Sequence, residues 1–216
     1  MDGMEVAVES VETVGPDTVA LVLETPDGFD AAPGQFVQLA ATIDGEEVTR
    51  HYTLSSPDAE GTFEVTVEVD PEGSLSPYLA DLTPGDRVEV AGPFGNSYYE
   101  GEDGVVVLAG GPGVGPAVGI GERATENGGA VTIVYEDDQP VHEDRLAALS
   151  AAGANVAITT DVTSEDVVAL LANATGQVFV YGFADFLDEA TAALDAARLS
   201  PEEAKTENFG PAPESS

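Results

Sequence analysis

The chain has 216 residues, with 41 acidic and 6 basic side chains, a formal net charge of −35 and no cysteine. This charge argues against DNA or RNA as a partner, because nucleic-acid binding depends on Lys and Arg that neutralise phosphates, and it disfavours an anionic membrane surface. The lack of cysteine excludes disulfides, cysteine-ligated zinc and an iron–sulfur cluster held by this chain. Hydrophobic residues make up 43% of the chain, so we expect a folded core rather than disorder.

The acidic residues are dispersed along the chain rather than gathered in a tail. At molar salt the Debye length is about 3 Å, so repulsion between carboxylates is mostly screened. The composition therefore favours a protein from a salt-filled cytoplasm, with an acidic protein from ordinary salt as the alternative. Residues 1–15 contain no basic side chain, and no apolar run approaches about 18 residues, so we expect no secretory signal and no membrane span.

The first hundred residues are predicted to form short strands separated by turns. Val65 and Val67 alternate with polar neighbours over residues 62–69, which is typical of a half-buried antiparallel strand. Comparable apolar patterns cover residues 6–11, 19–23, 36–39 and 87–90, and Pro-Gly and Pro-Asp-Gly sequences mark the turns between them. A short helix is predicted at residues 74–81. Many short strands at this spacing favour a small antiparallel β-barrel over residues 1–100.

An acidic stretch at residues 100–104 is predicted to be a flexible link to a second part of different character. Beyond it, buried strands alternate with helices, which predicts an α/β domain with a parallel sheet over residues 101–210. The expected strands are 105–109, 131–135, 156–160 and 178–181, and the expected helices are 116–126, 142–151, 164–173 and 185–198. The chain is predicted to loosen from Pro201 onward, with residues 211–216 as a disordered tail.

The strongest local motif is Arg50-His51-Tyr52-Thr53. Side chains alternate along a strand, so Arg50 and Tyr52 are expected to share a face and His51 to point to the opposite one. A guanidinium can hold a phosphate, an aromatic ring can stack on a flat heterocycle, and the Thr53 hydroxyl can donate to a ring nitrogen. The alternative is an ordinary strand with a surface arginine and a packed tyrosine.

Two glycine turns follow, each opening a predicted helix. At residues 73–76, Gly-Ser-Leu-Ser leaves backbone N–H groups free for an anion, although simple helix capping explains it equally well. At residues 110–116, Gly-Gly-Pro-Gly-Val-Gly-Pro follows a strand, where glycines would let the backbone approach a pyrophosphate. The second turn is not a dinucleotide-binding fingerprint, because its third glycine would fall at Pro116, a residue suited to the first helical position.

Four motifs occur in order along the chain: Arg-x-Tyr-Thr-x-x-Ser from residue 50, Gly-x-x-Ser-x-Tyr-Leu from 73, Gly-Asp-x-Val-x-Val-x-Gly-Pro-Phe-Gly from 85, and Gly-Gly-x-Gly-Val-x-Pro from 110. Together, over roughly residues 5–210, they resemble the ferredoxin–NADP reductase superfamily in its compact form without a fused iron–sulfur domain. The resemblance implies an FAD-binding β-barrel at residues 1–100 and an NAD(P)-binding domain at residues 101–210.

The resemblance also implies roles for individual residues. Arg50 would hold a flavin phosphate, Tyr52 would lie against the isoalloxazine, and Thr53 would hydrogen-bond near its reactive nitrogen. Glu207 and Phe209, in a Glu-x-Phe-Gly sequence, would lie near the flavin or the nicotinamide, which makes Thr53, Tyr52 and Glu207 the candidate catalytic residues. The flavin pyrophosphate would face Gly73, Ser74, Leu75 and Ser76, and the pyridine nucleotide would face Gly110, Gly111, Gly113 and Val114.

The departures from the family pattern lie on the nucleotide side. Pro112 stands where the family usually has threonine, and the Cys-Gly-Pro expected after the fourth strand of the second domain is replaced by the sequence beginning at Tyr181. Asp137 and Asp138 stand where many relatives have arginine, which weakly favours NADH. Arg123 and Arg145 are the nearby cations that could reverse this preference.

The leading hypothesis is an enzyme, a flavin-dependent oxidoreductase that passes a hydride from NADH or NADPH to FAD and electrons to a carrier such as ferredoxin. FAD is favoured over FMN because FMN has no use for the turn at residues 73–76. The alternatives are an electron-transfer subunit of a larger complex and a flavin-binding sensor or interaction module without hydride transfer. No metal site is expected, since His51 and His142 have no suitably spaced partner and are interpreted as structural.

Overall fold

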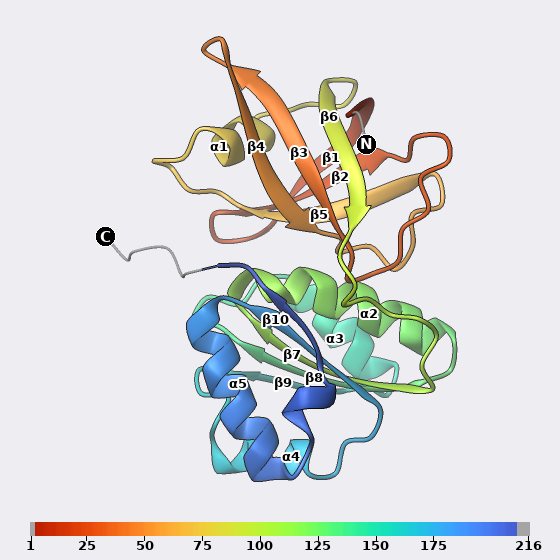
Figure 1. Cartoon of the computed structure of the whole chain (residues 1–216), viewed down its shortest axis with the longest axis vertical. Coiled ribbons are helices and arrows are strands. Elements are labelled where there is room, and N and C mark those ends of the chain that lie inside the picture. Colours follow the sequence, from red (N-terminus) through yellow and green to blue (C-terminus); the bar gives the residue numbers. More distant parts are fainter. Residues whose placement is uncertain (1–2, 211–216) are drawn as a thin grey trace.

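The computed structural model describes residues 3–210, in which a β-sheet part formed by the earlier residues is stacked on a helix-covered part formed by the later ones (Figure 1). The predicted tail at residues 211–216 lies outside the described residues. Across residues 3–210, none of the helices combines the length and the apolar character needed to cross a membrane.

The first part is an antiparallel sheet with strand order β4-β3-β6-β1-β2-β5. Its elements are β1 (Met4–Gly15), β2 (Thr18–Glu24), β3 (Phe36–Ile43), β4 (Glu46–Thr53), β5 (Thr62–Glu68), α1 (Leu75–Ala80) and β6 (Arg87–Phe94). Just beyond β4, a backbone bridge joins Leu54 to Val65, and the Ser55 N–H donates to the Glu64 carbonyl at 2.8 Å. The two edge strands therefore meet at one end, and the sheet encloses a valine- and leucine-rich core.

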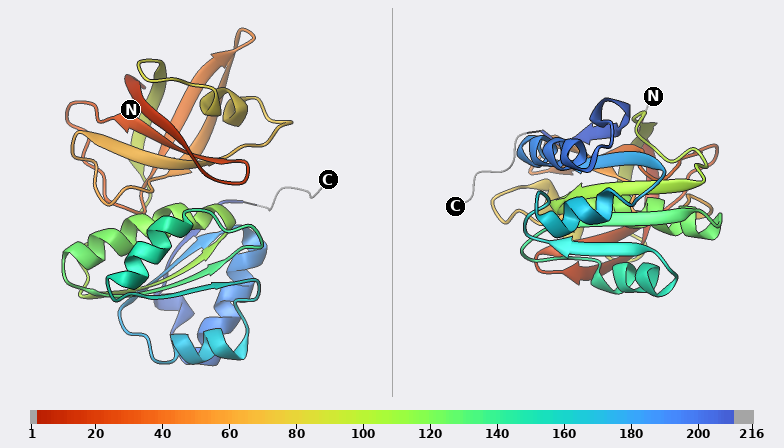
Figure 2. Two further views of the ribbon diagram at one scale, coloured as in Figure 1. Left: turned by 180° about the vertical axis from the view of Figure 1, so that it is seen from behind. Right: turned by 90° about the horizontal axis from the view of Figure 1, so that it is seen from below.

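The second part is a parallel sheet with strand order β11-β10-β7-β8-β9 and helices on both faces (Figure 2). Its strands are β7 (Gly104–Gly110), β8 (Ala130–Glu136), β9 (Asn155–Thr159), β10 (Gln177–Gly182) and β11 (Lys205–Asn208), and its helices are α2 (Val114–Glu126), α3 (Glu143–Ala151), α4 (Glu165–Leu171) and α5 (Ala184–Ala197). Every residue of β7 is buried, as expected for a central strand covered on both faces. The predicted fold class, an antiparallel β part followed by a parallel α/β part, is confirmed.

The prediction that the chain loosens from Pro201 onward is wrong for residues 201–208. Residues 205–208 form β11, which pairs in parallel with β10. The Lys205 ammonium donates to the Tyr98 carbonyl at 2.8 Å and to the carboxylates of Glu100 and Glu102 at 2.7 Å each. The same contacts tie down the acidic stretch at residues 100–104, which was expected to be a flexible link.

Helices α2 and α3 fix the two parts against each other. A Cβ on Gly119 of α2 would lie 2.9 Å from the carbonyl oxygen of Ser56 and 3.0 Å from that of Ser55, so only glycine allows this approach. From α3, the Arg145 guanidinium donates to the Ser55 carbonyl at 2.6 Å and to Glu64 at 2.7 Å, and it also binds Glu122 of α2. The segment that follows β4 is therefore held directly against α2 and α3 of the second part.

Candidate functional site

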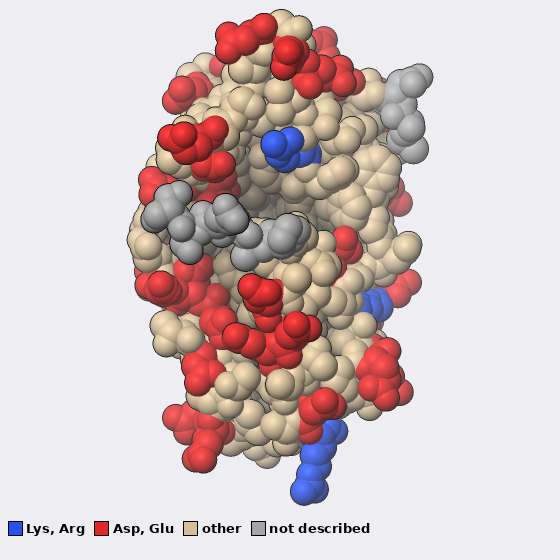
Figure 3. All heavy atoms as spheres, turned by 60° about the vertical axis from the view of Figure 1, so that its left-hand side comes forward, with Lys and Arg blue, Asp and Glu red and all other residues tan. Residues whose placement is uncertain are grey.

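A cavity of about 400 Å³, here called the first cavity, opens where the two parts meet. The β part lines it with Phe36, His51, Tyr52, Thr53, Thr66 and Glu68, and the α/β part with Pro112, Phe183, Glu207, Asn208 and Phe209. The structure thus brings together Tyr52 and Thr53 with Glu207 and Phe209, although more than 150 residues of sequence separate the two pairs. The face that Figure 3 shows is hollowed between the two parts and bordered by many acidic side chains.

A second cavity of about 260 Å³ adjoins the first and lies at the carboxyl ends of β7, β8 and β10. Its lining consists of Pro16, Asp17, Thr18, Thr66, Glu68, Gly111, Pro112, Tyr135, Asp137, Gln139, Val141 and Phe183. In open α/β sheets ligands bind beyond the carboxyl ends of the strands, so the second cavity is where such a sheet offers a ligand site. Thr66, Glu68, Pro112 and Phe183 line both cavities, so the cavities share a wall.

The register of β4 places Arg50 and Tyr52 on one face. Arg50 pairs with Leu39 and Tyr52 with Val37, both of which point into the core, whereas His51 pairs with the outward-facing Gln38. The expected face sharing is therefore confirmed. His51 nevertheless lines the first cavity, where its ring meets the ring of Phe36 edge to face with centroids 5.4 Å apart.

Tyr52 and Thr53 present hydroxyl groups suited to donate a hydrogen bond into the first cavity. Burial raises the pKa of Tyr52 to about 12, and the Arg50 charge opposes this shift only in part, so the phenol keeps its proton at neutral pH. Within residues 3–210, the half-buried Thr53 hydroxyl makes no hydrogen bond to another protein group. A hydroxyl without a protein partner remains free to bind a ligand atom.

Arg50 is exposed, and its Nη1 donates only to the Thr49 carbonyl at 2.8 Å. In the described part of the chain, Arg50 and Arg198 are the cations that form no ion pair, and the other cations each bind at least one carboxylate. In a protein with 41 acidic residues, a guanidinium without a carboxylate partner remains available to an anion.

The turn at residues 73–76 lies beside β4 but lines neither cavity. Ser74 is exposed, and the Ser76 hydroxyl accepts a hydrogen bond from the Asp70 N–H at 3.1 Å. Leu75 is 2% exposed and belongs to the core of the β part, so its side chain does not face a ligand. Gly73 is half-buried, and its N–H donates to the Asp70 carbonyl.

Of the four predicted nucleotide contacts after β7, only Gly111 lines a cavity. Its φ of 52° lies in the left-handed region that favours glycine, and a Cβ at this position would meet no other residue within 4 Å. Gly110 and Gly113 are buried, and the Val114 side chain is fully buried in the core of the α/β part. Pro116 is the third residue of α2 rather than the first, because the helix begins at Val114.

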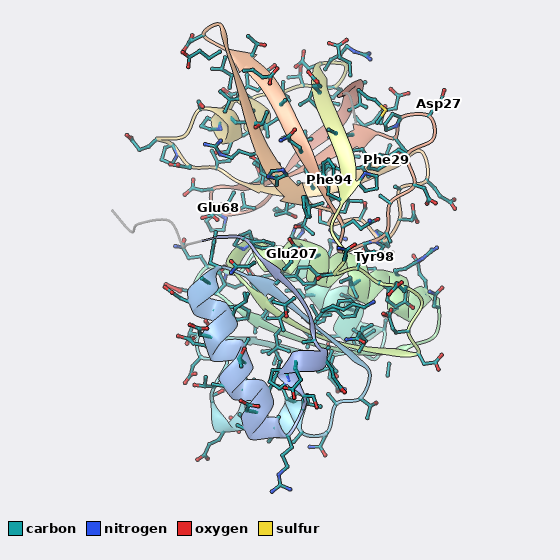
Figure 4. All side chains as sticks on the ribbon, viewed as in Figure 1. Asp27, Phe29, Glu68, Phe94, Tyr98 and Glu207 are labelled. Carbon is teal, nitrogen blue, oxygen red and sulfur yellow. The ribbon has the colours of Figure 1, made fainter. Side chains whose placement is uncertain are left out.

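Carboxylates surround the junction of the two cavities. Burial raises the pKa of Glu207, and partial burial raises that of Glu68, with the charges of Asp137 and Asp70 adding to the second shift. Figure 4 shows Glu68 in the β part and Glu207 in the α/β part, at the level where the parts meet. Asp137 accepts hydrogen bonds from the Tyr135 hydroxyl at 2.9 Å and the Gln139 N–H at 2.8 Å.

The two cations expected to offset these carboxylates are engaged elsewhere. Arg145 binds Glu64 and Glu122, and Arg123 binds Glu126 at 3.3 Å. No Lys or Arg lines either cavity among the described residues. The second cavity is therefore an acidic site.

Sequence reasoning missed several residues of the junction. Thr66 and Glu68 belong to an alternating strand that carries no local mark of a site, and Phe183 was noted only as part of a departure from Cys-Gly-Pro. The one available signal was the position of Phe183 directly after β10, at the edge of the sheet where ligands bind.

His142 is the N-cap residue directly before α3, one residue from the predicted helix start, and joins the two parts through a 2.8 Å hydrogen bond between its Nε2 and the Thr66 hydroxyl. Burial lowers the pKa of His142 from 6.5 to about 4, and the Arg145 charge adds to the shift. Between these pH values the unfolded chain binds a proton that the folded protein does not. The contribution of His142 to the free energy of unfolding is therefore complete above pH 6.5 and falls, by up to about 3 kcal/mol, as the pH drops towards 4.

We expect His142→Gln, which keeps a hydrogen-bonding side chain that does not titrate, to flatten the pH dependence of stability in this window. Urea unfolding of both proteins at several pH values between 6.5 and 4 measures it. Parallel curves for the two proteins would show that His142 is not neutral in the folded state.

Comparison with known proteins gives one family match and many relatives. Residues 5–99 match the family described as the oxidoreductase FAD-binding domain. The toluate 1,2-dioxygenase electron transfer component of Pseudomonas putida is 31% identical over 173 residues, which cover 76% of this chain and 51% of that protein. NADH-cytochrome b5 reductase 1 of Eremothecium gossypii is 40% identical over 87 residues, covering 38% of this chain and 30% of that protein. The chain thus spans about half, or less, of the length of these relatives.

Solved structures match the fold over nearly the whole described chain. The ferredoxin NADP+ reductase of Neisseria gonorrhoeae, with bound FAD and NADP, has a TM-score of 0.81 at 17% identity and covers 97% of this chain and 99% of that one. The FAD/NAD-binding domain of a nitric oxide dioxygenase from Vibrio cholerae has a TM-score of 0.80 at 20% identity and covers 98% and 100%. At sequence identities of 17% and 20%, these two matches establish a similarity of fold alone.

Proposed function

Because the chain belongs to the ferredoxin–NADP reductase superfamily, we propose that it is an FAD-dependent oxidoreductase that takes a hydride from a reduced pyridine nucleotide and passes electrons to a protein carrier. The observation that carries this proposal is the shared wall of the two cavities. The first cavity contains the β4 motif and the C-terminal Glu207 and Phe209, and the second lies at the carboxyl ends of the parallel strands. This arrangement lets two flat rings from different ligands meet.

The residues of the first cavity fit a flavin. Its volume of about 400 Å³ is in the usual range for a ligand site, and Phe36, Tyr52 and Phe209 supply aromatic walls. When bound, FAD accepts the hydride and releases electrons one at a time. The chain would hold a flavin phosphate with Arg50, place the Tyr52 ring against the isoalloxazine, and donate a hydrogen bond from Thr53 to a ring nitrogen.

The turn at residues 73–76 supports FAD over FMN in this proposal, since its backbone would face a pyrophosphate that only the larger flavin has. Gly73, Ser74 and Ser76 are exposed or half-buried and are not packed in the core. Leu75 would contribute only through its backbone.

The chain's own groups would contact the nucleotide from both cavities, with Gly111 and Asp137 in the second cavity and Glu207 in the first. Gly111 has no side chain, so the nucleotide pyrophosphate could approach the protein backbone closely there. Glu207 would lie near the nicotinamide. Its raised pKa brings its carboxyl group closer to exchanging protons at neutral pH. Asp137 would accept from ribose hydroxyls. We propose NADH rather than NADPH as the physiological donor. Glu68 and Asp137 would repel the 2′-phosphate of NADPH, and no Lys or Arg in the described lining of the second cavity offsets their charge.

The nucleotide preference gives a direct prediction. A like charge at about 4 Å opposes binding by roughly 1 kcal/mol even in water and by more in a partly buried site, so kcat/KM for NADH should exceed that for NADPH at least about fivefold. Asp137→Asn should narrow the ratio, mainly through the KM for NADPH. Equal use of both nucleotides by the unaltered protein would contradict the assignment.

A turnover assay tests the proposed activity itself. The protein is loaded with FAD in molar salt, and NADH oxidation is followed with ferricyanide as a one-electron acceptor. We expect the FAD-loaded protein to reduce ferricyanide at a rate that saturates with NADH concentration. The same preparation stripped of flavin should reduce none. An FAD-loaded protein that leaves both NADH and NADPH unchanged would exclude the reductase function.

We further propose that the protein works in a salt-rich cytoplasm with an acidic electron carrier such as a ferredoxin. The net charge of −35 supports this setting, because molar salt screens repulsion between two acidic partners. Electron transfer to an acidic ferredoxin should hold or rise as KCl increases towards 1 M or more. A rate that falls steadily over this range would contradict the salt-adapted setting.

A further inference from the structure

One face of β5 lies against the α/β part and carries three polar side chains. The valines and the phenylalanine of this strand point into the core of the β part, so Glu64, Thr66 and Glu68 point the other way. Glu64 binds Arg145 of α3 at 2.7 Å, whereas Glu68 lines both cavities. Thr66 therefore lies between the contacts that hold the two parts together and the cavities.

His142 contacts the Thr66 hydroxyl from a backbone conformation that most side chains avoid. Its φ of 55° and ψ of 26° lie in the left-handed region, which is uncommon outside glycine and persists where the surroundings fix it. His142 is 4% exposed, and its N–H donates to the Val14 carbonyl at 3.0 Å. The residue is thus held from the β part at its backbone and, through the 2.8 Å contact of Nε2 with Thr66, at its ring.

The proton of the imidazole determines what the Thr66 hydroxyl offers to a ligand. Burial lowers the pKa of His142 to about 4, so the ring is neutral near pH 7 and carries one proton. A hydroxyl has one hydrogen and two lone pairs, and within residues 3–210 the hydrogen bond with His142 is the one that the Thr66 hydroxyl forms. When Nε2 carries the proton, it donates to the Thr66 oxygen and leaves the hydroxyl hydrogen free for a ligand.

The wall that the two cavities share consists of Thr66, Glu68, Pro112 and Phe183. The side chains of Pro112 and Phe183 form no hydrogen bonds, and an ionised Glu68 only accepts them, so Thr66 is the side-chain donor of this wall. Thr66 and Glu68 are two positions apart on one face of β5, which puts a donor beside an acceptor. A primary carboxamide carries the matching pair, a carbonyl oxygen that accepts and an NH₂ group that donates.

We propose that His142 is a positioning residue, whose Nε2–H donates to the Thr66 oxygen so that the Thr66 O–H donates to the amide carbonyl oxygen of the nicotinamide. Glu68 accepts from the NH₂ group of the same amide. This inference rests on the proposed function, because it needs a nicotinamide that meets the flavin at the shared wall. It adds to that function a means of fixing the orientation of the nicotinamide ring, on which the rate of hydride transfer depends.

The test compares NADH with reduced thionicotinamide adenine dinucleotide, in which sulfur replaces the amide oxygen and accepts hydrogen bonds more weakly. The FAD-loaded protein is assayed with ferricyanide, and the ratio of kcat/KM for the two nucleotides is compared between variants, so that their intrinsic difference in reactivity cancels. Thr66→Val removes the hydroxyl but keeps the shape, and it should lower the preference for NADH about three- to tenfold. Thr66→Ser keeps the hydroxyl and should retain the preference to within about twofold.

Two amides at position 142 separate positioning from packing. Asparagine tolerates the left-handed backbone but is too short to reach Thr66, whereas glutamine can place an amide N–H where Nε2 lies. His142→Asn should therefore lower the preference for NADH as Thr66→Val does, and His142→Gln should retain it to within about twofold. Equal losses in both variants would reduce His142 to a packing role and overturn the inference.

Ser55→Ala is the matched control. Ser55 is fully buried at the same interface, and its hydroxyl donates to the Glu64 carboxylate at 2.6 Å, but it lines neither cavity. Its loss should lower stability without changing the preference between the two nucleotides. An unchanged preference in Thr66→Val or in His142→Asn would overturn the inference and leave the proposed function intact. Failure of the unaltered FAD-loaded protein to oxidise both NADH and NADPH would overturn both.

Discussion

Replacing Arg50 with alanine should weaken FAD binding about ten- to a hundredfold and leave the fold intact. Hydrogen bonds to a charged group contribute about 1.5–3 kcal/mol, and this guanidinium has no carboxylate partner in the described structure that would compete for it. Arg50 is exposed on an edge strand, so its removal leaves no cavity in the core. Flavin fluorescence during dilution of the FAD-loaded protein measures the dissociation constant.

Two variants make the Arg50 result specific. Arg50→Lys keeps the charge but not the paired donors, so it should retain only part of the affinity. Arg87→Ala removes an exposed arginine from another strand of the same sheet and should leave FAD affinity unchanged. Full flavin occupancy in Arg50→Ala would remove Arg50 from the flavin site.

Replacing Arg145 with alanine should destabilise the protein by about 3 kcal/mol. The guanidinium binds Glu64 at 2.7 Å, Glu122 at 2.6 Å and the Ser55 carbonyl at 2.6 Å, with 23% of its side chain exposed. Its loss would leave two partly buried carboxylates facing each other without compensation, which is more costly than the pair itself is stabilising. Urea unfolding in molar salt measures the change, and the burial of the network means that salt should not abolish it.

Arg123→Ala is the control for the Arg145 prediction. Arg123 forms an exposed pair with Glu126 one helical turn away, so its loss should cost no more than about 0.5 kcal/mol. Adding Glu64→Gln and Glu122→Gln to Arg145→Ala should recover part of the stability, since it removes the uncompensated charges. Equal effects of Arg145→Ala and Arg123→Ala would show that the interdomain network is not a main source of stability.

Local pattern was sufficient to predict most of the fold. The alternation around Val65 and Val67 reports a sheet with one buried face, and the continuous apolar run of β7 reports a strand covered on both faces. β11 escaped prediction because Lys-Thr-Glu-Asn has no apolar alternation. It is held by the edge of β10 and by the contacts of Lys205 with residues about 100 positions earlier, which leave no local signal.

The candidate site was predictable where the alternation of side chains along a strand determines which face each side chain lies on. Arg50 and Tyr52 share a face because side chains alternate, and that follows from spacing alone. Long-range contacts such as those of Arg145 with Glu64 and of His142 with Thr66 join residues more than 70 positions apart, so spacing could not reveal them. Leu75 and Val114 fell within motifs whose glycines and hydroxyls suggested a ligand, but their apolar side chains are packed in the cores.

An anaerobic titration tests the central claim most directly. The protein is purified in molar salt, reconstituted with FAD, freed of excess flavin and titrated with NADH while its visible absorbance is recorded. The account predicts that the protein retains FAD and that about one equivalent of NADH bleaches the flavin absorbance. A protein that retains no flavin would contradict the flavin site, and a bound flavin that stays oxidised under excess NADH and NADPH would instead indicate a flavin-binding sensor or interaction module.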